Sequence, residues 1–359
     1  RVAGPPVGEV VESTVLIGGY ATGVVTNALP PLTEKPGLLE PEEYETQYTL
    51  VDFDQPQPPS KFEVGVEALI GRMGAKSQLR TWLVQNFPPC YAYVEPFGGS
   101  FKVLLWKPRR DKVEVINDVD NDMVHLFRYC VHDPEGFAAA VNRLPTHEAI
   151  IMGYRDALAR RALKGIERAV ACYYSLVGSF NDQGTSYFSN VYQQSSVRVD
   201  ERRVRAFAKR LRGVDIRCTD FNRIIDMANK QLDPKVYAPG KVFFYLDPPY
   251  WGTAGYRTHQ GVSSFGWSQQ VKLAERCWEI HQAGNLFIET NSDHDDLKKL
   301  YGGYKLADGS PAFYVERREV YYSVGGSVEA RSERGEFIIS NFPLQTERER
   351  NQVQRGLFS

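Results

Sequence analysis

The chain has 359 residues, enough for one large core or for one core with a smaller added domain. Its composition is that of a globular protein, and the formal net charge of -1 taken alone argues against a nucleic-acid partner. Between Arg143 and Arg217, however, 14 Lys and Arg accompany 7 Asp and Glu, which leaves 29 basic and 37 acidic residues elsewhere. A basic segment in an acidic chain favours a polyanion on one face, although the solvated surface of ordinary helices gives the same pattern.

The five cysteines are widely spaced and odd in number, and they form no C-x-x-C pair. This usage favours a reducing compartment, so we expect a cytoplasmic protein. No apolar run reaches membrane-spanning length, and we therefore expect no membrane partner. The chain begins at Arg1 rather than Met, which is consistent with a longer precursor or fused protein.

Residues 1–60 differ from the rest of the chain. Tyr48–Phe53 alternates like a strand, and prolines cluster before and after it. We predict a small β-rich extension over 1–60 that ends in a stiff linker.

From about Lys61 strands and helices alternate, which predicts an α/β fold: a Rossmann-like, doubly wound mixed sheet. The predicted strands are Tyr91–Glu95, Val113–Ile116, Val214–Cys218, Val242–Leu246 and Leu286–Glu289, with a late hairpin ending in Glu336–Ser340. The predicted helices are Ser77–Asn86, Asn121–Val131 and Gln269–Ala283. We divide the chain into five parts: the extension 1–60, a first catalytic part 61–142, a basic helical insert 143–217, a second catalytic part 218–345 and a tail 346–359.

Four predicted strands run into polar, Gly or Pro residues where they end. These positions follow Glu95 and lie at Asp118, Asp220 and Asp247. Ligands of doubly wound sheets bind at the carboxyl ends of the strands, so this coincidence predicts a binding site there.

The strongest motif is Asp247-Pro248-Pro249-Tyr250, which follows an apolar strand. Two prolines end the ladder and fix the backbone. An exocyclic base amine is a poor nucleophile because its lone pair is delocalised into the ring. The Asp247 carboxylate and the Pro248 carbonyl could accept both of its N–H bonds and free the lone pair, while Tyr250 offers a face for a base removed from the helix.

This motif resembles the catalytic motif of amino-methyltransferases, and the whole arrangement resembles the Dam-type DNA adenine-N6 methyltransferases, which include many phage members. Glu95-Pro96-Phe97-Gly98-Gly99-Ser100 is similar to their cofactor loop and precedes the catalytic motif, the order of the alpha group. The regions around Asp118 and Asp220, and the strand Glu336–Ser340, are also similar. The resemblance covers about residues 69–343.

The resemblance implies S-adenosylmethionine as the cofactor and double-stranded DNA as the partner. It places the cofactor against Lys76, Glu95, Pro96, Phe97, Gly98, Gly99, Ser100, Asp118, Asp220 and Phe221. Asp118 would bind the ribose hydroxyls and Asp220 the adenine amino group, although a helix cap and an ordinary turn acid are the alternatives. The insert would contact DNA through Arg155, Arg160, Arg161, Asn181, Gln183, Arg198, Arg202 and Arg203.

Relatives often have small residues where this chain has Phe101 and Lys102, and an aromatic where it has Arg72. We expect these changes to crowd or recharge the cofactor pocket. One alternative is therefore a methyltransferase-like DNA-binding module with impaired cofactor binding. Another keeps the chemistry and changes the substrate to cytosine N4, RNA or a protein amide; Asp at position 247 favours adenine.

His294-Asp295-Asp296 looks like a set of metal ligands. We interpret it instead as the start of a helix capped by Ser292-Asp293, and we predict no metal site. Trp251, Phe265 and Trp267 follow the catalytic strand, and either a wall for the base or core packing would suit them.

Overall fold

The computed structural model describes most of the chain from residue 65 onward. The described ranges are 65–71, 79–109, 111–178, 197–231, 242–252, 256–258, 261–263, 265–323 and 331–344. The predicted extension 1–60 and tail 346–359 lie outside these ranges. So do Lys76, Arg72, Asn181 and Gln183, and their predicted roles stay predictions.

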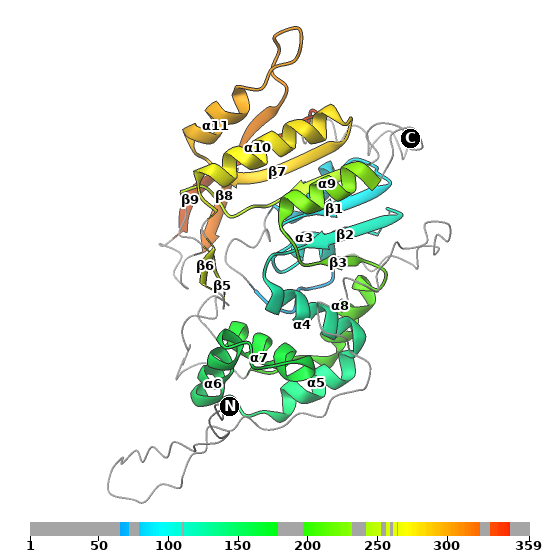
Figure 1. The fold of residues 1–359 in the computed structure, drawn as a ribbon, viewed down its shortest axis with the longest axis vertical. Helices are drawn as coiled ribbons and strands as arrows, with labels where there is room; N and C mark the ends of the chain where they lie inside the picture. The colour runs from blue at the N-terminus through cyan, green and yellow to red at the C-terminus, as the bar shows by residue number, and fades with distance from the viewer. Residues whose placement is uncertain are drawn as a thin grey trace, which may run out of the picture.

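A seven-stranded mixed sheet organises the fold, in the order β3-β2-β1-β4-β7-β9-β8 (Figure 1). Its strands are β1 Ala92–Glu95, β2 Val113–Asn117, β3 Asp215–Arg217, β4 Val242–Leu246, β7 Leu286–Ser292, β8 Tyr314–Ser323 and β9 Arg331–Ser340. The first five strands of that order are parallel, and β9 pairs antiparallel with both β7 and β8. The predicted α/β fold is confirmed. A separate hairpin pairs β5 Tyr256–Thr258 with β6 Gly261–Ser263.

Helices cover both faces of the sheet. The helices of the described residues are α2 Arg80–Asn86, α3 Lys102–Trp106, α4 Asn121–His132, α5 Pro134–Arg143, α6 Glu148–Ala159, α7 Gly165–Val177, α8 Glu201–Leu211, α9 Phe221–Gln231, α10 Trp267–Gln282 and α11 Asp295–Gly302. In β4, Phe244 and Leu246 pack with α9, α10 and α11, whereas Phe243 and Tyr245 pack on the opposite core. Burial on both faces explains why β4 is an uninterrupted apolar run.

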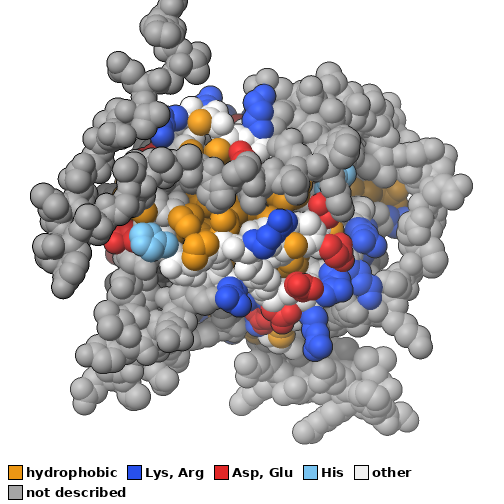
Figure 2. All heavy atoms as spheres, turned by 90° about the horizontal axis from the view of Figure 1, so that it is seen from below, with side chains coloured by type: hydrophobic (Ala, Val, Ile, Leu, Met, Phe, Trp, Pro, Cys, Tyr) orange, Lys and Arg blue, Asp and Glu red, His pale blue; other side chains and the backbone are white. Residues whose placement is uncertain are grey.

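The helices α5, α6 and α7 gather beyond the β3 edge of the sheet (Figure 1). This helical group lies between β2 and β3 in the chain; α6 and α7 fall inside the region predicted as an insert, whereas α5 precedes it. The structure also places Asp215–Arg217, which we assigned to the insert, in the sheet as β3. Figure 2 looks at this end of the molecule and shows Lys and Arg interspersed with Asp and Glu around apolar side chains. This end is therefore not uniformly basic.

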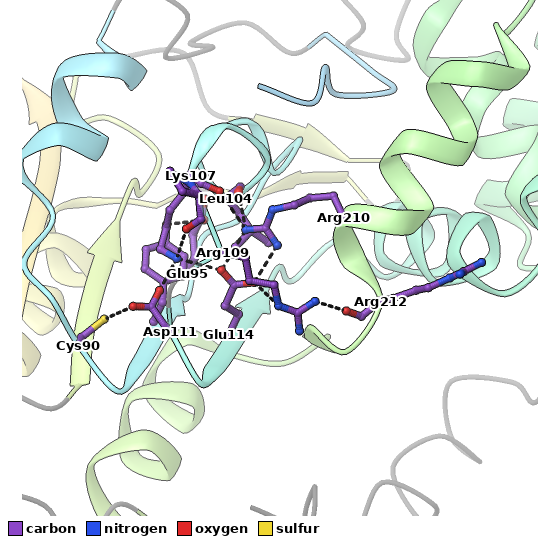
Figure 3. Close-up of polar contacts among 11 residues, drawn as sticks. Cys90, Glu95, Leu104, Lys107, Arg109, Asp111, Glu114, Arg210 and Arg212 are labelled. Carbon is purple, nitrogen blue, oxygen red and sulfur yellow. Dashed lines mark hydrogen bonds and ion pairs between the residues drawn. The ribbon is translucent and has the colours of Figure 1, made fainter. Parts of the chain in front are cut away.

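A buried ion cluster joins α8, the last helix before β3, to the sheet (Figure 3). It consists of Lys107, Asp111, Glu114 and Arg210. Glu114 of β2 accepts two hydrogen bonds from Arg210, at 2.7 and 3.0 Å, and one from Lys107 at 2.9 Å. Burial alone would raise the pKa of Glu114, but the two cations outweigh it and lower that pKa. Arg210 lies in the basic segment, yet it has a structural role rather than one in binding DNA.

Two local predictions are wrong. The strand predicted to end at Glu289 continues to Ser292, because β7 keeps pairing with β9 through three polar residues. The cap of the following helix is His294, whose Nδ1 accepts from the Asp296 amide, and not Ser292-Asp293. Asp295 and Asp296 do occupy the first turn, where the positive end of the helix dipole favours acids.

Candidate active site

Three loops at the carboxyl edge of the sheet are tied together by one side chain, Asn117. Its Nδ2 donates to the carbonyls of Pro96 and Thr219, both at 2.9 Å, and its Oδ1 accepts from the Thr219 amide. The Asn117 carbonyl in turn accepts from the Gly98 amide at 2.7 Å. Because Asn117 is 1% exposed, these bonds are shielded from water and hold the loops after β1, β2 and β3 in one arrangement.

The glycine loop after β1 lies against the acid that follows β2. Gly99 has a φ of +52°, and a side-chain carbon built on it would meet no atom within 4 Å, so the loop opens onto free space there. The Gly99 amide donates to Asp118 Oδ2 at 2.8 Å, and the Asp120 amide donates to Asp118 Oδ1. Asp120, and not Asp118, caps α4.

Phe101 does not crowd this surface, contrary to our expectation. Its ring is fully buried and packs on Phe127 of α4, with ring centroids 4.5 Å apart. A side-chain carbon on Gly98 would lie 2.6 Å from the Phe101 ring, so this glycine makes room for the ring beneath the loop. Phe101 itself takes a left-handed φ of +61°, which directs its side chain into the core. The argument for a module with impaired cofactor binding therefore loses its support from Phe101.

Aromatic rings border the β3 side of the site. Phe97, Phe221 and Phe265 pack together, with ring centroids 5.1 to 5.7 Å apart. Asp220 precedes α9 and is exposed, and its Oδ1 accepts from the backbone and the side chain of Asn222. Asp220 thus forms the turn that starts α9 while its carboxylate faces solvent.

The Asp247-Pro248-Pro249-Tyr250 motif lies at the end of β4, between β1 and β7. Asp247 is half-buried, and its Oδ1 accepts from the Thr290 hydroxyl at 2.8 Å. The Tyr250 hydroxyl donates to Glu336 Oε2 at 2.8 Å, which fixes the ring against β9. The carboxylate is therefore at the edge of the sheet rather than turned into the protein interior.

A buried amide pair supports the two prolines. Gln270 of α10 donates to the Pro249 carbonyl at 2.9 Å, and its own side-chain oxygen accepts from Asn291. Asn291 Oδ1 accepts from the Trp251 amide at 3.1 Å. Gln270 and Asn291 are both 0% exposed, so the backbone on either side of Tyr250 is held from the interior. Trp251 packs on Trp267, with ring centroids 5.1 Å apart.

Two buried acids flank Asp247 on the neighbouring strands. Burial raises the pKa of Glu95 to about 8; the bond from Tyr93 opposes this and the charge of Asp247 adds to it. Burial likewise raises the pKa of Glu289 to about 7, against the bonds from Tyr301 and Asn291. Near neutral pH, Glu95 therefore carries a proton, which limits the negative charge beside Asp247.

Comparison with known families agrees with this geometry. The family model of D12 class N6 adenine-specific DNA methyltransferases matches residues 73–310. The chain belongs to this family. No curated protein matches the sequence. Members of the D12 class are enzymes that methylate adenine N6 in DNA with S-adenosylmethionine as the methyl donor, and the predicted activity is confirmed at this level.

The D12 family implies a cofactor, and the residues at the strand edge fit one. Gly99 leaves an open cradle, and Asp118 and Asp220 present carboxylates at two adjacent strand ends. In the part of the chain that the structure describes, no cluster of three or more His, Cys, Asp or Glu side chains could hold a metal ion. Within the same residues, no helix has the length and apolar character needed to span a bilayer.

Sequence reasoning missed five supporting residues of this D12 methyltransferase: Thr290, Asn291, Gln270 and Glu336, which hold the Asp247–Tyr250 motif, and Asn117, which holds the loops after β1, β2 and β3. All five are polar side chains that are almost fully buried. Thr290 and Asn291 come after Glu289, just beyond the apolar part of β7, and these polar residues at the end of a strand beside the Asp247–Tyr250 motif were the available signal. Asn117 directly precedes Asp118 in the sequence, and its role was not predicted.

Stability should depend on pH through the two buried acids. The pKa is raised from 4.5 to about 8 in Glu95 and to about 7 in Glu289, so between these values the folded protein keeps protons that the unfolded chain releases. The free energy of unfolding therefore falls as pH rises from about 4.5 to about 8. We expect Glu95→Gln to weaken this decline, as followed by urea unfolding at pH 5 and pH 8. Glu275→Gln, at an exposed position of α10, is the control and should keep the wild-type dependence of unfolding free energy on pH. The same dependence in Glu95→Gln as in wild type would contradict the prediction.

Proposed function

We propose that the protein methylates N6 of an adenine flipped out of double-stranded DNA, with Asp247 and the Pro248 carbonyl as the acceptors for its amine. The observation that supports this most directly is the position of Asp247. Its half-exposed carboxylate lies at the end of β4, beside the strand that carries the open glycine loop. A group bound in the loop and a base above the motif would meet at the same sheet edge.

The residues of the motif act by positioning and charge. Asp247 and the Pro248 carbonyl accept the two N–H bonds of the amine, which turns its lone pair away from the ring and toward the methyl donor. Tyr250 offers a face for the base to stack on, and its bond to Glu336 keeps that ring in place. As the nitrogen forms its bond to the methyl carbon, the bond between that carbon and the sulfonium sulfur would break and leave a neutral thioether. The Asp247 carboxylate is placed to stabilise the positive charge on the nitrogen and to take up the proton that the nitrogen then releases.

The cofactor would be held by the three loops that Asn117 ties together. The backbone of Pro96, Gly98, Gly99 and Ser100 would hold the methionine part of the cofactor, with Glu95 and Phe97 flanking the loop. Asp118 would bind the ribose hydroxyls of the cofactor, and Asp220 with Phe221 would bind its adenine ring; Lys76 is proposed from the resemblance alone. S-adenosylmethionine supplies an electrophilic methyl group that needs no metal for its activation.

DNA would contact the exposed arginines at the ends of α6 and α8. Arg160, Arg161, Arg198 and Arg202 are exposed, whereas Arg155 is half-buried and contacts Met152. Arg203 donates to the Ala68 carbonyl, so it also supports the fold. Because Arg203 is bonded to the backbone, we propose Arg160, Arg161, Arg198 and Arg202 as the primary phosphate contacts.

Replacing Arg198 or Arg202 with Gln should weaken DNA binding with little regard to sequence. Each lost phosphate contact is expected to reduce the slope of log K against log salt by about 0.9. Fluorescence anisotropy on a duplex at several salt concentrations measures this slope. Lys272→Gln on α10 serves as the control of equal charge, and a slope that does not differ from wild type in either arginine variant would contradict the assignment.

The proposed function is tested by following a labelled methyl group from S-adenosylmethionine into duplex DNA and identifying the methylated base. We expect N6-methyladenine. Label in cytosine, or transfer to single-stranded RNA in preference to duplex DNA, would overturn the substrate assignment. Calorimetry tests cofactor binding separately: no heat of binding at millimolar S-adenosylmethionine would favour a DNA-binding module.

A further inference from the structure

A hydroxyl on the neighbouring strand holds the carboxylate of Asp247. Thr290 lies on β7, which pairs with β4, and its Oγ1 is 2.8 Å from Asp247 Oδ1. An ionised carboxylate can only accept, so Thr290 donates the shared proton. Because Thr290 is 0% exposed, water does not compete for this bond.

Tyr245 gives this hydrogen bond its direction. The Tyr245 hydroxyl lies 3.3 Å from Thr290 Oγ1. Thr290 gives its proton to Asp247, so its oxygen accepts the proton of Tyr245. Burial raises the pKa of Tyr245 well above its usual range, and the charge of Asp247 adds to this effect, so Tyr245 stays a protonated donor. The hydroxyl of Thr290 is thereby held in one rotation.

We propose that Thr290 is a positioning residue for methyl transfer, and that the chain from Tyr245 through Thr290 to Asp247 sets the rotation of the catalytic carboxylate. This inference rests on the proposed function, in which Asp247 accepts from the target amine. A carboxylate free to rotate about its Cβ–Cγ bond would direct its lone pairs toward the amine only part of the time. Thr290 removes that freedom before the base arrives.

The test compares Thr290→Val with Thr290→Ser in steady-state methyl transfer. Val keeps the shape of Thr but cannot donate, and the loss of a hydrogen bond to a charged group corresponds to a fall in kcat of about 10- to 100-fold. We expect KM for both substrates to stay within about threefold of wild type, because Thr290 positions a group that acts in the transition state. Thr290→Ser restores the donor and should recover kcat to within about threefold.

Two further variants separate positioning from folding. Tyr245→Phe leaves the bond from Thr290 to Asp247 but frees the hydroxyl rotation, so we expect a smaller fall in kcat of about three- to tenfold. Ser340→Ala removes another fully buried hydroxyl of the same sheet, which donates to the Phe342 carbonyl, and should leave kcat unchanged. Unfolding midpoints measured alongside show whether each variant is folded.

Thr290→Val with kcat within twofold of wild type would overturn the inference, as would Thr290→Ser impaired as strongly as Thr290→Val. Either result leaves the proposed function intact as long as Asp247→Ala is inactive. An active Asp247→Ala would instead remove the proposed function, and the role of Thr290 with it.

Discussion

Replacing Asp247 with Ala is expected to lower kcat by about 100- to 1000-fold while the protein stays folded. The carboxylate is the charged acceptor of the motif, and losing one preorganised group of this kind costs on the order of 100- to 1000-fold in rate. The Pro248 carbonyl alone cannot replace it, because a single neutral acceptor leaves one N–H of the amine unbound. Single-turnover transfer of labelled methyl to duplex DNA measures the loss.

Asp226→Ala is a matched control for this experiment. Asp226 is a half-exposed carboxylate on α9 that pairs with Arg276, away from the strand edge. We expect its kcat to equal that of wild type. Asp247→Asn keeps one acceptor oxygen and should fall between wild type and Asp247→Ala. If Asp247→Ala retains activity within tenfold of wild type, Asp247 is not the catalytic acceptor.

Glu114→Gln is expected to have the largest effect on stability, a loss of about 3–5 kcal/mol in the free energy of unfolding. The side chain of Glu114 is 0% exposed, and those of Lys107 and Arg210 are 6% and 5% exposed, so Gln would leave two buried cations with Asp111 as the one remaining carboxylate of the cluster. Urea unfolding at pH 7 measures the loss. Because the pKa of Glu114 is lowered from 4.5, the difference from wild type should shrink as pH falls below 4.5.

An exposed ion pair provides the comparison. Glu201 and Arg205 are 60% and 52% exposed on α8, and Glu201→Gln should cost about 0.5 kcal/mol or less. The double variant Glu114→Gln with Arg210→Met also removes the buried cation of Arg210, which has lost its carboxylate partner. It should therefore be more stable than Glu114→Gln alone. A Glu114→Gln protein as stable as Glu201→Gln would show that the buried ion cluster does not fasten α8 to the sheet.

Much of the sheet was predictable because its central strands are buried on both faces. Val242–Leu246 was predicted with the bounds that β4 has, since an apolar run ends there at an Asp and two prolines. The convergence of Asp118, Asp220 and Asp247 followed from parallel strands ending at one edge. These inferences needed only local pattern and one rule of topology.

The supporting contacts were not predictable, because they depend on partners far apart in the sequence. Glu114 and Arg210 are 96 residues apart, and Thr290 and Asp247 are 43 apart. Thr and Asn are polar residue types that are common in loops, so the sequence alone did not indicate that they are buried in β7. The predicted strand therefore ended too early. The position of the Phe101 ring was predicted wrongly for a related reason. Its backbone is left-handed and its ring lies in the core, and no pattern of residue types predicts that conformation.

The fourfold bonding of Asn117 has a thermodynamic consequence for ligand capture. Loops fastened to one another during folding have already lost their conformational entropy when a small molecule arrives, so association need not order them again. Affinity at this edge then reflects contacts with the ligand rather than a rearrangement of the backbone. The heat-capacity change on binding should accordingly be small, matching the apolar area of the ligand alone.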